Sequence, residues 1–239
     1  MNKKFNSFLI TTLSGLSTLL GIIPCLFNSK NKDKTIVFSL SLSSGVMFTI
    51  SIISLIPESI NYLNNKYSLL IFILLGFIFT LSIDKLFTNN NPLYRLGLIS
   101  TLAIVLHNIP EGIMTFISYN INRKLGLKLA LAITLHNIPE GISISVPIYY
   151  STKDIFKAFK YTFIAGFSEL LGAIITYLFL INTITNSYMG YILGITAGIM
   201  LEISLLELLP TALKYKKNKL SIISFVLGII IMIICNYIF

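Results

Sequence analysis

Two identical stretches of sequence carry the side chains best suited to chemistry in this chain. The string His-Asn-Ile-Pro-Glu-Gly occurs at residues 107–112 and again at 136–141, each time near the middle of a long apolar stretch. On a helix, a histidine and a glutamate four positions apart share one face, about one turn from each other. Each pair offers an imidazole nitrogen and a carboxylate oxygen, which suit zinc, iron, manganese and similar divalent ions. The predicted strong metal ligands are His107, Glu111, His136 and Glu140.

The other residues of each string add to this prediction. Asn108 and Asn137 lie three positions before the glutamates, where they could serve a second, adjacent ion or orient the strong ligands. Pro110 and Pro139 each remove one backbone donor, so we expect kinked helices with a freed carbonyl beside each histidine. Such a carbonyl is tolerated at membrane depth where it lines a cavity or finds a partner. We therefore expect two antiparallel, cavity-lining helices that bring both strings together.

Five of the nine acidic residues lie inside apolar stretches rather than at their ends: Glu111, Glu140, Glu169, Glu202 and Glu207. A charge at the bilayer centre costs on the order of 3 kcal/mol, and no lysine or arginine is expected at that depth to pair with them. They must be protonated or bind a cation, and the nearby histidines favour a metal. Interhelical hydrogen bonding by protonated carboxyls is the alternative, most credible for Glu202 or Glu207 singly. Glu169, at the centre of the next apolar stretch, is predicted to be a further ligand.

Composition predicts an all-α integral membrane protein. The chain is 55% hydrophobic and 11% charged, against roughly 25% charged in soluble domains, and its mean hydropathy is +0.84. Apolar runs of about 20 residues, the length that crosses a bilayer, recur along the chain and are joined by short polar connections. We expect one transmembrane domain over residues 1–239. Its eight predicted spans are 5–27, 35–57, 67–83, 94–119, 125–150, 157–181, 187–211 and 217–238.

The basic residues predict how the chain lies in the membrane. The formal net charge is +9, but the lysines and arginines fall in predicted loops, at span ends or near the N-terminus, which argues against nucleic-acid binding. With both termini outside, the outer side holds six basic residues and the inner loops hold twelve. These twelve are Lys30, Lys32, Lys34, Lys85, Arg95, Lys153, Lys157, Lys160, Lys214, Lys216, Lys217 and Lys219. The positive-inside rule thus favours a multi-pass protein of the cell membrane with both termini outside. Residues 1–27 also resemble a signal peptide, although an uncleaved first span is the favoured interpretation.

A second internal repeat relates the second and seventh predicted spans. Gly45–Pro57 aligns without gaps to Gly198–Pro210, with glycine, methionine, serine and proline in register. With three spans before the central pair and three after it, matching spans run in opposite directions. This predicts a 3+2+3 inverted-topology repeat, a transporter design with its site at the midplane. Chance similarity of apolar helices is the alternative. Met47 and Met200 are candidate soft ligands, Met47 the better one, although packing is the favoured role for both.

The doubled string, the eight spans, Glu169 and the Gly198–Pro210 segment together resemble the ZIP (Zrt/Irt-like) family of metal transporters, particularly its bacterial branch. The resemblance covers essentially the whole chain. It implies movement of divalent metal, chiefly zinc, into the cytoplasm, by a homodimer in which a transport bundle makes an elevator-like movement. It also implies a binuclear centre on spans four and five with bridging glutamates. In that centre His107, Glu111, His136 and Glu140 would form the principal site, and Asn108, Asn137 and Glu169 would help to form the second.

An enzyme is the rival interpretation of the same residues. An intramembrane metal-dependent hydrolase, in which bound zinc activates water, would share the buried histidines and glutamates. Against it, the chain contains neither His-Glu-x-x-His nor Gly-x-Ser-x-Gly. It also lacks a Gly-rich phosphate-binding loop, so ATP is not expected to drive it. The favoured prediction is transport of Zn²⁺ without a catalytic cofactor, with Fe²⁺, Mn²⁺, Co²⁺ and Cd²⁺ as further substrates, because these ligands accept all five ions.

Overall fold

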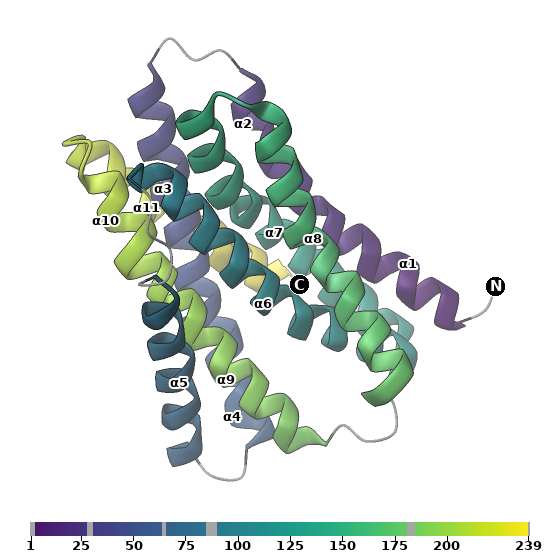
Figure 1. The fold of residues 1–239 in the computed structure, drawn as a ribbon. Coiled ribbons are helices and arrows are strands. Elements are labelled where there is room, and N and C mark those ends of the chain that lie inside the picture. Colours follow the sequence, from purple (N-terminus) through teal and green to yellow (C-terminus); the bar gives the residue numbers. More distant parts are fainter. Residues whose placement is uncertain (1–2, 28–30, 64–65, 85–89, 181–184, 239) are drawn as a thin grey trace.

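A computed structural model describes residues 3–27, 31–63, 66–84, 90–180 and 185–238. Within these ranges every regular element is a helix, so the fold is all-α, as composition predicts (Figure 1). Residue 181 of the sixth predicted span and two inner-loop lysines, Lys30 and Lys85, lie outside these ranges. The helices are α1 (Lys3–Leu16), η1 (Ser17–Ile22), α2 (Ile23–Leu26), α3 (Lys32–Ile50), η2 (Ser51–Leu55), α4 (Ile56–Tyr62), α5 (Lys66–Asp84), α6 (Pro92–Ile121), α7 (Arg123–Thr152), α8 (Ile155–Ile175), η3 (Thr176–Leu180), α9 (Asn186–Glu202), η4 (Ile203–Leu208), α10 (Leu209–Leu213) and α11 (Asn218–Ile238).

These helices have the length and composition of membrane spans. Seven helical segments in the described part of the chain are long and apolar enough to cross a bilayer, and α5 contains a shorter apolar helix over Tyr67–Ile83. The first, second, sixth and seventh spans each join two or three helical elements end to end. Helices α6 and α7 have 30 residues each, so at 1.5 Å per residue they are about 45 Å long. They therefore exceed the hydrocarbon core, which is about 30 Å thick.

Side-chain caps fix the starts of the three consecutive helices α6, α7 and α8. Asn91, Asn122 and Asp154 each accept two backbone N–H hydrogen bonds from the first turn of the helix that follows. A single residue, Asn122, separates α6 from α7, so these helices are antiparallel neighbours. His107 and His136 lie nearly the same number of residues from this turn, and the two strings therefore meet at one depth.

Glycines allow the helices of the site to approach until their backbones touch. A Cβ added at Gly112 of α6 would lie 2.0 Å from the carbonyl oxygen of Glu169 in α8. One added at Gly141 of α7 would lie 1.8 Å from the carbonyl oxygen of Thr18 in η1. Both distances are far below van der Waals contact, so any side chain would push the helices apart. The last residue of each repeated string thus seats its helix against a neighbour.

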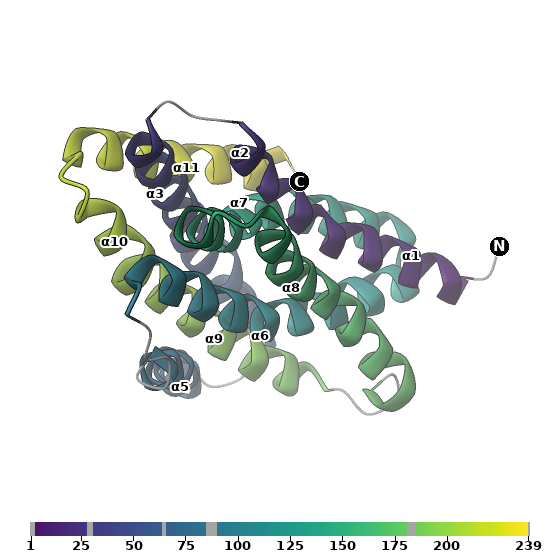
Figure 2. The same ribbon diagram turned by 45° about the horizontal axis from the view of Figure 1, so that its top comes forward.

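A second set of helices packs in the same manner. A Cβ added at Gly45 of α3 would lie 2.1 Å from the carbonyl oxygen of Phe225 in α11, and one at Gly198 of α9 would lie 2.0 Å from that of Ile73 in α5. Figures 1 and 2 both show α5 beside α9 and away from α1. We name the helices α1, α6, α7 and α8 the site bundle, and the pairs α3–α11 and α5–α9 the outer pairs.

Prolines affect the two sets of helices differently. In the second and seventh spans, the π-helical turns η2 and η4 come shortly before Pro57 and Pro210, within the two segments that align in sequence. A proline lacks a backbone N–H and crowds the preceding turn, and a widened turn relieves that crowding. In the site bundle, α6 and α7 continue as α-helix through Pro110 and Pro139. The expected kinks therefore do not interrupt either ligand-bearing helix.

Candidate metal centre

The two repeated strings face each other where α6 packs against α7. His107 Nε2 lies 3.0 Å from Glu140 Oε1, and His136 Nε2 lies 2.8 Å from Glu111 Oε1. Each histidine therefore pairs with the glutamate of the other helix. His107 Nε2 also lies 3.3 Å from Glu111 Oε1 on its own helix. The four side chains form one cluster shared by both helices.

The spacing within this cluster is close to that of a metal site. One potential ligand atom each from His107, Glu111 and His136 lies within 4.8 Å of the others. Zinc binds nitrogen and oxygen at roughly 2.0–2.2 Å, which places the ligands of one tetrahedral ion about 3.5 Å apart. The hydrogen bonds between imidazole and carboxylate thus hold together the atoms that an ion would bind. Small side-chain adjustments would convert these hydrogen bonds into metal coordination.

The two asparagines bond to the protein through their amide nitrogens, and their amide oxygens have no hydrogen-bond partner among the described residues. Asn108 Nδ2 donates to the carbonyl oxygen of Ala165 at 3.0 Å, and Asn137 Nδ2 donates to that of Ser14 at 3.0 Å. Asn137 Nδ2 also donates to Glu169 Oε1, which brings this third glutamate to the cluster. Because the nitrogens are held by backbone carbonyls, the Oδ1 atoms are left to accept from another group.

Burial and incomplete hydrogen bonding make the cluster suitable for a cation. Glu140 and Glu169 are 0% exposed, and His107 and Glu111 are 1% and 4% exposed. The ion-pair partners of Glu111 and Glu140 are histidines. Within the described residues, the cluster atoms that lack a hydrogen-bond partner are His107 Nδ1, Asn108 Oδ1, Glu111 Oε2, Asn137 Oδ1, Glu140 Oε2 and Glu169 Oε2. Unsatisfied buried acceptors are costly, and a divalent cation would satisfy the oxygens at once.

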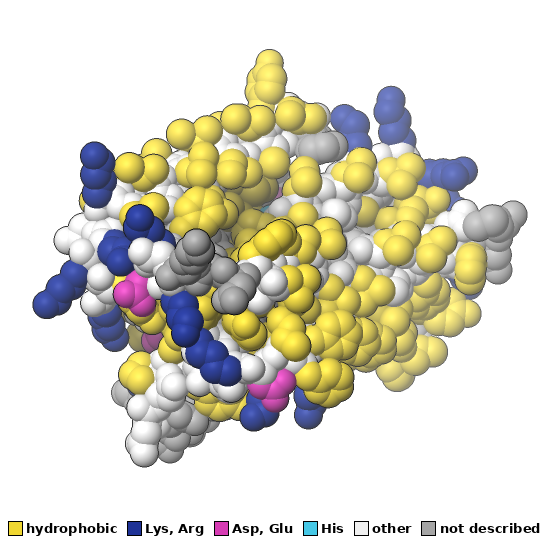
Figure 3. All heavy atoms as spheres, turned by 90° about the horizontal axis from the view of Figure 1, so that it is seen from above, with side chains coloured by type: hydrophobic (Ala, Val, Ile, Leu, Met, Phe, Trp, Pro, Cys, Tyr) yellow, Lys and Arg dark blue, Asp and Glu magenta, His cyan; other side chains and the backbone are white. Residues whose placement is uncertain are grey.

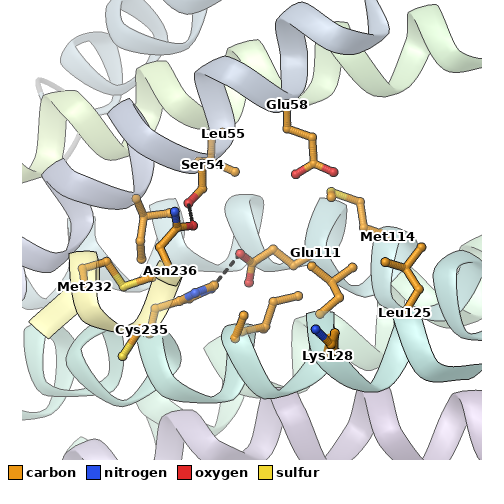
Figure 4. A pocket seen from close by; sticks show the side chains of 15 residues that line it. Ser54, Leu55, Glu58, Glu111, Met114, Leu125, Lys128, Met232, Cys235 and Asn236 are labelled. Atoms are coloured by element: carbon orange, nitrogen blue, oxygen red, sulfur yellow. Dashed lines mark hydrogen bonds and ion pairs between the residues drawn. The ribbon is translucent and has the colours of Figure 1, made fainter. Parts of the chain in front are cut away.

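A cavity of about 250 Å³ adjoins this cluster (Figure 4). Glu111 and His136 lie on its wall, and so does Lys128, close to the turn between α6 and α7. Glu58 of α4 and Asn236 of α11 line it as well, and Figure 4 shows the carboxylates of Glu58 and Glu111 facing the same space. The cluster is therefore accessible from the end of the helices where α6 joins α7.

The structure separates the predicted residues into two sets. It brings together the histidine, asparagine and glutamate side chains of the two strings, with Glu169. Met47 and Met200 are buried in an apolar cluster with neighbours such as Met114 and Ile142, an environment that suits packing. The remaining two glutamates of the apolar spans, Glu202 in α9 and Glu207 in η4, lie on the seventh span rather than on the site bundle.

Sequence reasoning missed two features of this site. Glu58 is at the end of its predicted span, yet it lines the cavity together with Ser54, whose hydroxyl donates to Asn236 Oδ1 at 3.2 Å. The four-residue spacing of Ser54 and Glu58 was the available signal, because it places both on one helix face. Ser43 of α3 donates to the carbonyl oxygen of Pro139 at 2.6 Å, between His136 and Glu140 of α7. No pattern in the sequence indicates that contact.

The fold and the site define a class of protein: a multi-pass membrane protein of α-helices with a buried cluster of side chains suited to a divalent cation. The model of the family described as ZIP zinc transporter matches residues 88–236, and the chain belongs to this family. The resemblance inferred from the repeated string is therefore confirmed.

Three bacterial proteins named zinc transporter ZupT are similar over nearly the whole chain. The protein from Clostridium perfringens is 36% identical over 278 residues, covering 100% of this chain and 98% of the relative. The protein from Streptococcus mutans is 39% identical over 259 residues, with 98% of both chains covered. The protein from Chlorobium phaeovibrioides is 38% identical over 258 residues, with 97% of both covered. The family and these relatives are transporters rather than enzymes, which sets aside the intramembrane hydrolase.

Proposed function

We propose that this protein carries Zn²⁺ across the cell membrane into the cytoplasm through the cluster on α6, α7 and α8. The observation that carries the proposal is the meeting of seven buried ligand side chains, six of which contain an atom without a hydrogen-bond partner. Relatives named zinc transporter favour zinc as the substrate. Fe²⁺, Mn²⁺, Co²⁺ and Cd²⁺ are proposed as further substrates, because imidazole and carboxylate ligands accept them all.

We propose that the cluster binds two ions side by side. His107, Glu111, His136 and Glu140 would hold the first, and Asn108, Asn137 and Glu169 would help to hold the second. The division of the carboxylate oxygens supports this arrangement. In both Glu111 and Glu140, Oε1 contacts a histidine while Oε2 has no hydrogen-bond partner, so each glutamate has one oxygen for each ion. A glutamate that bridges two ions would use both of its carboxylate oxygens.

Met47 remains a proposed further ligand. It is fully buried on α3, one helical turn beyond Ser43. The Ser43 hydroxyl donates to the carbonyl oxygen of Pro139, which places this part of α3 directly against the ligand-bearing part of α7. A thioether near the cluster would add a soft ligand for zinc or cadmium.

We propose one transmembrane domain over residues 1–239 with a 3+2+3 inverted repeat. Several contacts support the pairing of the first three spans with the last three. The second span packs through Gly45 on the eighth, and the seventh packs through Gly198 on the third, as a two-fold relation requires. A π-helical turn follows each of these glycines at a matching position, in η2 and η4. Inverted repeats of this kind place the substrate site at the midplane.

The contacts of the metal-binding cluster are consistent with the same two-fold relation between the first three and the last three spans. Asn137 of the fifth span bonds to Ser14 of the first, and Asn108 of the fourth span bonds to Ala165 of the sixth. The residues that follow Ser14 and Ala165 are Gly15 and Gly166, and these two glycines pack against each other. A Cβ added to either glycine would lie within 2.4 Å of the carbonyl oxygen of the other. An axis between α6 and α7 would therefore relate both halves of the site.

The membrane potential suffices to drive such transport. At about 2.3 kcal/mol per charge and 100 mV, an inward-moving divalent ion gains about 4.6 kcal/mol. The ligands must be deprotonated to bind metal, so protons compete with zinc, and uptake should weaken at low pH. The excess of basic residues on the predicted inner side supports both termini outside. With that orientation, the cavity beside Glu58 and Lys128 faces outward. A homodimer in the lipid bilayer is proposed from the family resemblance.

The test is zinc flux into proteoliposomes that contain the purified full chain. We expect uptake with the wild-type protein and loss of at least about 100-fold in the double variant Glu111→Ala, Glu140→Ala, because both bridging ligands are removed. The matched control is Glu202→Gln, which changes a buried glutamate outside the site bundle and should retain uptake. Wild-type protein that gives no flux under a zinc gradient and membrane potential would overturn the proposal.

A further inference from the structure

Four lysines from two distant parts of the chain surround an open hollow at the opposite end of the helices from the α6–α7 turn. The hollow, of about 520 Å³, is lined by Lys34 near the start of α3 and by Lys216, Lys217 and Lys219 around the α10–α11 turn. Figure 3 views this end of the molecule and shows Lys and Arg side chains gathered on its left, where α10 and α11 meet. This end therefore carries a local excess of positive charge.

Nearby groups offset only part of that charge. The carboxylate of Asp33 lies 3.9 Å from Lys217 Nζ, and both side chains contact solvent. On the same end of the molecule, burial and the positive charge of Lys32 lower the pKa of Lys153. The positive charge that remains at this end attracts anions.

An apolar groove continues from the hollow. This groove, of about 300 Å³, shares Lys34 and Leu220 with the hollow. Its other walls include Pro24 of α2, Phe38 of α3 and Ile142 of α7. Ile142 lies ten residues before the end of α7, so the groove reaches roughly 15 Å below that end, into the depth of the acyl chains. A basic mouth above an apolar groove has the polarity of a phospholipid.

We propose that the hollow and the groove together bind one anionic phospholipid, with the lysines around its phosphate and one acyl chain in the groove. Basic clusters at the cytoplasmic end of membrane helices attract anionic headgroups. A free phosphate ion would use the lysines alone, and the adjoining apolar groove is what favours a lipid over an ion.

The bound lipid would contact both sets of helices. Pro24 and Ile142 belong to the first and fifth spans, which carry or contact the metal cluster, whereas Phe38 and Leu220 belong to the α3–α11 pair. Ile142 directly follows Gly141, the last residue of the α7 string. The family resemblance implies that a transport bundle moves, and if that bundle is the site bundle, a lipid at this boundary would change the rate of its movement against the outer pairs. The proposed lipid binding is independent of transport, whereas its effect on the transport rate rests on the proposed function.

The test is native mass spectrometry of the full chain in detergent, titrated with phosphatidylglycerol or with phosphatidylcholine. We expect retention of phosphatidylglycerol but not phosphatidylcholine, and about a tenfold loss of affinity in the double variant Lys34→Gln, Lys219→Gln. The matched control is Lys157→Gln, Lys160→Gln, which removes two lysines of α8 at the same end and should bind like the wild type. Leu220→Trp, which fills the groove and keeps all lysines, should also weaken binding.

Three results would overturn the proposal. The first is equal retention of both lipids, and the second is unchanged binding by the Lys34→Gln, Lys219→Gln variant. The third is displacement of the lipid by inorganic phosphate at equal concentration, because that would indicate a simple anion site. Zinc uptake into phosphatidylcholine vesicles with and without phosphatidylglycerol then tests the effect on rate. Absence of uptake in every vesicle would contradict the proposed function and leave the binding result intact.

Discussion

The two copies of the His-Asn-Ile-Pro-Glu-Gly string have the same six residues but different neighbours. His136 of α7 lines the cavity with Glu111, whereas His107 of α6 is 1% exposed beside the fully buried Glu140. Asn137 bonds to a backbone carbonyl and to Glu169, whereas the Asn108 amide bonds to a backbone carbonyl. Each copy thus contributes one residue to the pair on the cavity wall and one to the enclosed pair, and the neighbouring helices cause the difference.

Glu169 is the residue that breaks the symmetry between the copies. The carbonyl oxygen of Glu169 contacts Gly112 of α6, and that of Thr18 contacts Gly141 of α7 in the same way. The first and sixth spans thus present a threonine and a glutamate at equivalent places. An otherwise symmetric cluster gains its third carboxylate on one side only. The second proposed ion would therefore lie off the axis between the helices.

The largest effect is expected when either histidine is removed. His107→Ala and His136→Ala should each lower zinc affinity by at least about 100-fold, because each histidine pairs with the glutamate of the other copy. Isothermal titration of the purified protein with zinc measures both variants. Two independent sites would behave differently, since each variant would then keep half of the bound zinc at unchanged affinity.

A smaller effect is expected when the symmetry is restored. Glu169→Thr gives the sixth span the residue that the first span has at Thr18. We expect the bound zinc to fall from two ions per chain to one, and flux to fall about tenfold, because the first site keeps its ligands. Elemental analysis after equilibrium dialysis measures the stoichiometry, with Thr18→Ser as the control that should leave it unchanged. Two ions per chain in Glu169→Thr would remove this glutamate from the site.

The pair on the cavity wall, Glu111 and His136, depends on that cavity, and a more modest effect is expected there. Glu58→Gln should raise the KM for zinc about threefold to tenfold with little change in maximal rate, because a carboxylate in a cavity concentrates cations. Uptake kinetics in proteoliposomes measure this, and high salt should reduce the difference. Asp154→Asn, which removes an exposed carboxylate at the opposite end and can still cap α8, should leave KM unchanged. A fall in maximal rate at constant KM would place Glu58 in the transport step instead.

The smallest effect is expected on stability, from the removal of one of two serines, Ser17 and Ser168, that lie at equivalent places in the first and sixth spans. Ser17 bonds within its own helical segment and also donates to the carbonyl oxygen of Thr134 in α7 at 3.1 Å, whereas Ser168 donates to Ala165 within α8. Ser17→Ala should lower stability by about 0.6 kcal/mol, the usual worth of a hydrogen bond between membrane helices. Ser168→Ala should change stability less. Thermal unfolding in detergent compares the two, and a larger loss in Ser168→Ala would contradict the comparison.

Local patterns in the chain were sufficient for the class of fold and for most candidate ligands. Apolar runs of bilayer length predicted helices that the structure places close to the expected ranges, because each helix satisfies its own backbone hydrogen bonds. The spacing of His107 and Glu111 predicted a shared helix face, which depends only on the geometry of one helix. The repeated string and its neighbours also identified the family before any tertiary contact was known.

Long-range packing decided the rest. The exchange of partners between α6 and α7, the bond from Asn137 to Glu169 and the position of Glu58 on the cavity wall all join residues from different helices. No helical periodicity encodes such contacts, since they depend on how close and at what rotation the helices pack. The sequence by itself determined which side chains are available to a metal ion and at what depth. Only the tertiary structure decided which of them meet, and from which end a cavity leads to them, because glycine-mediated backbone contacts set the rotation of each helix.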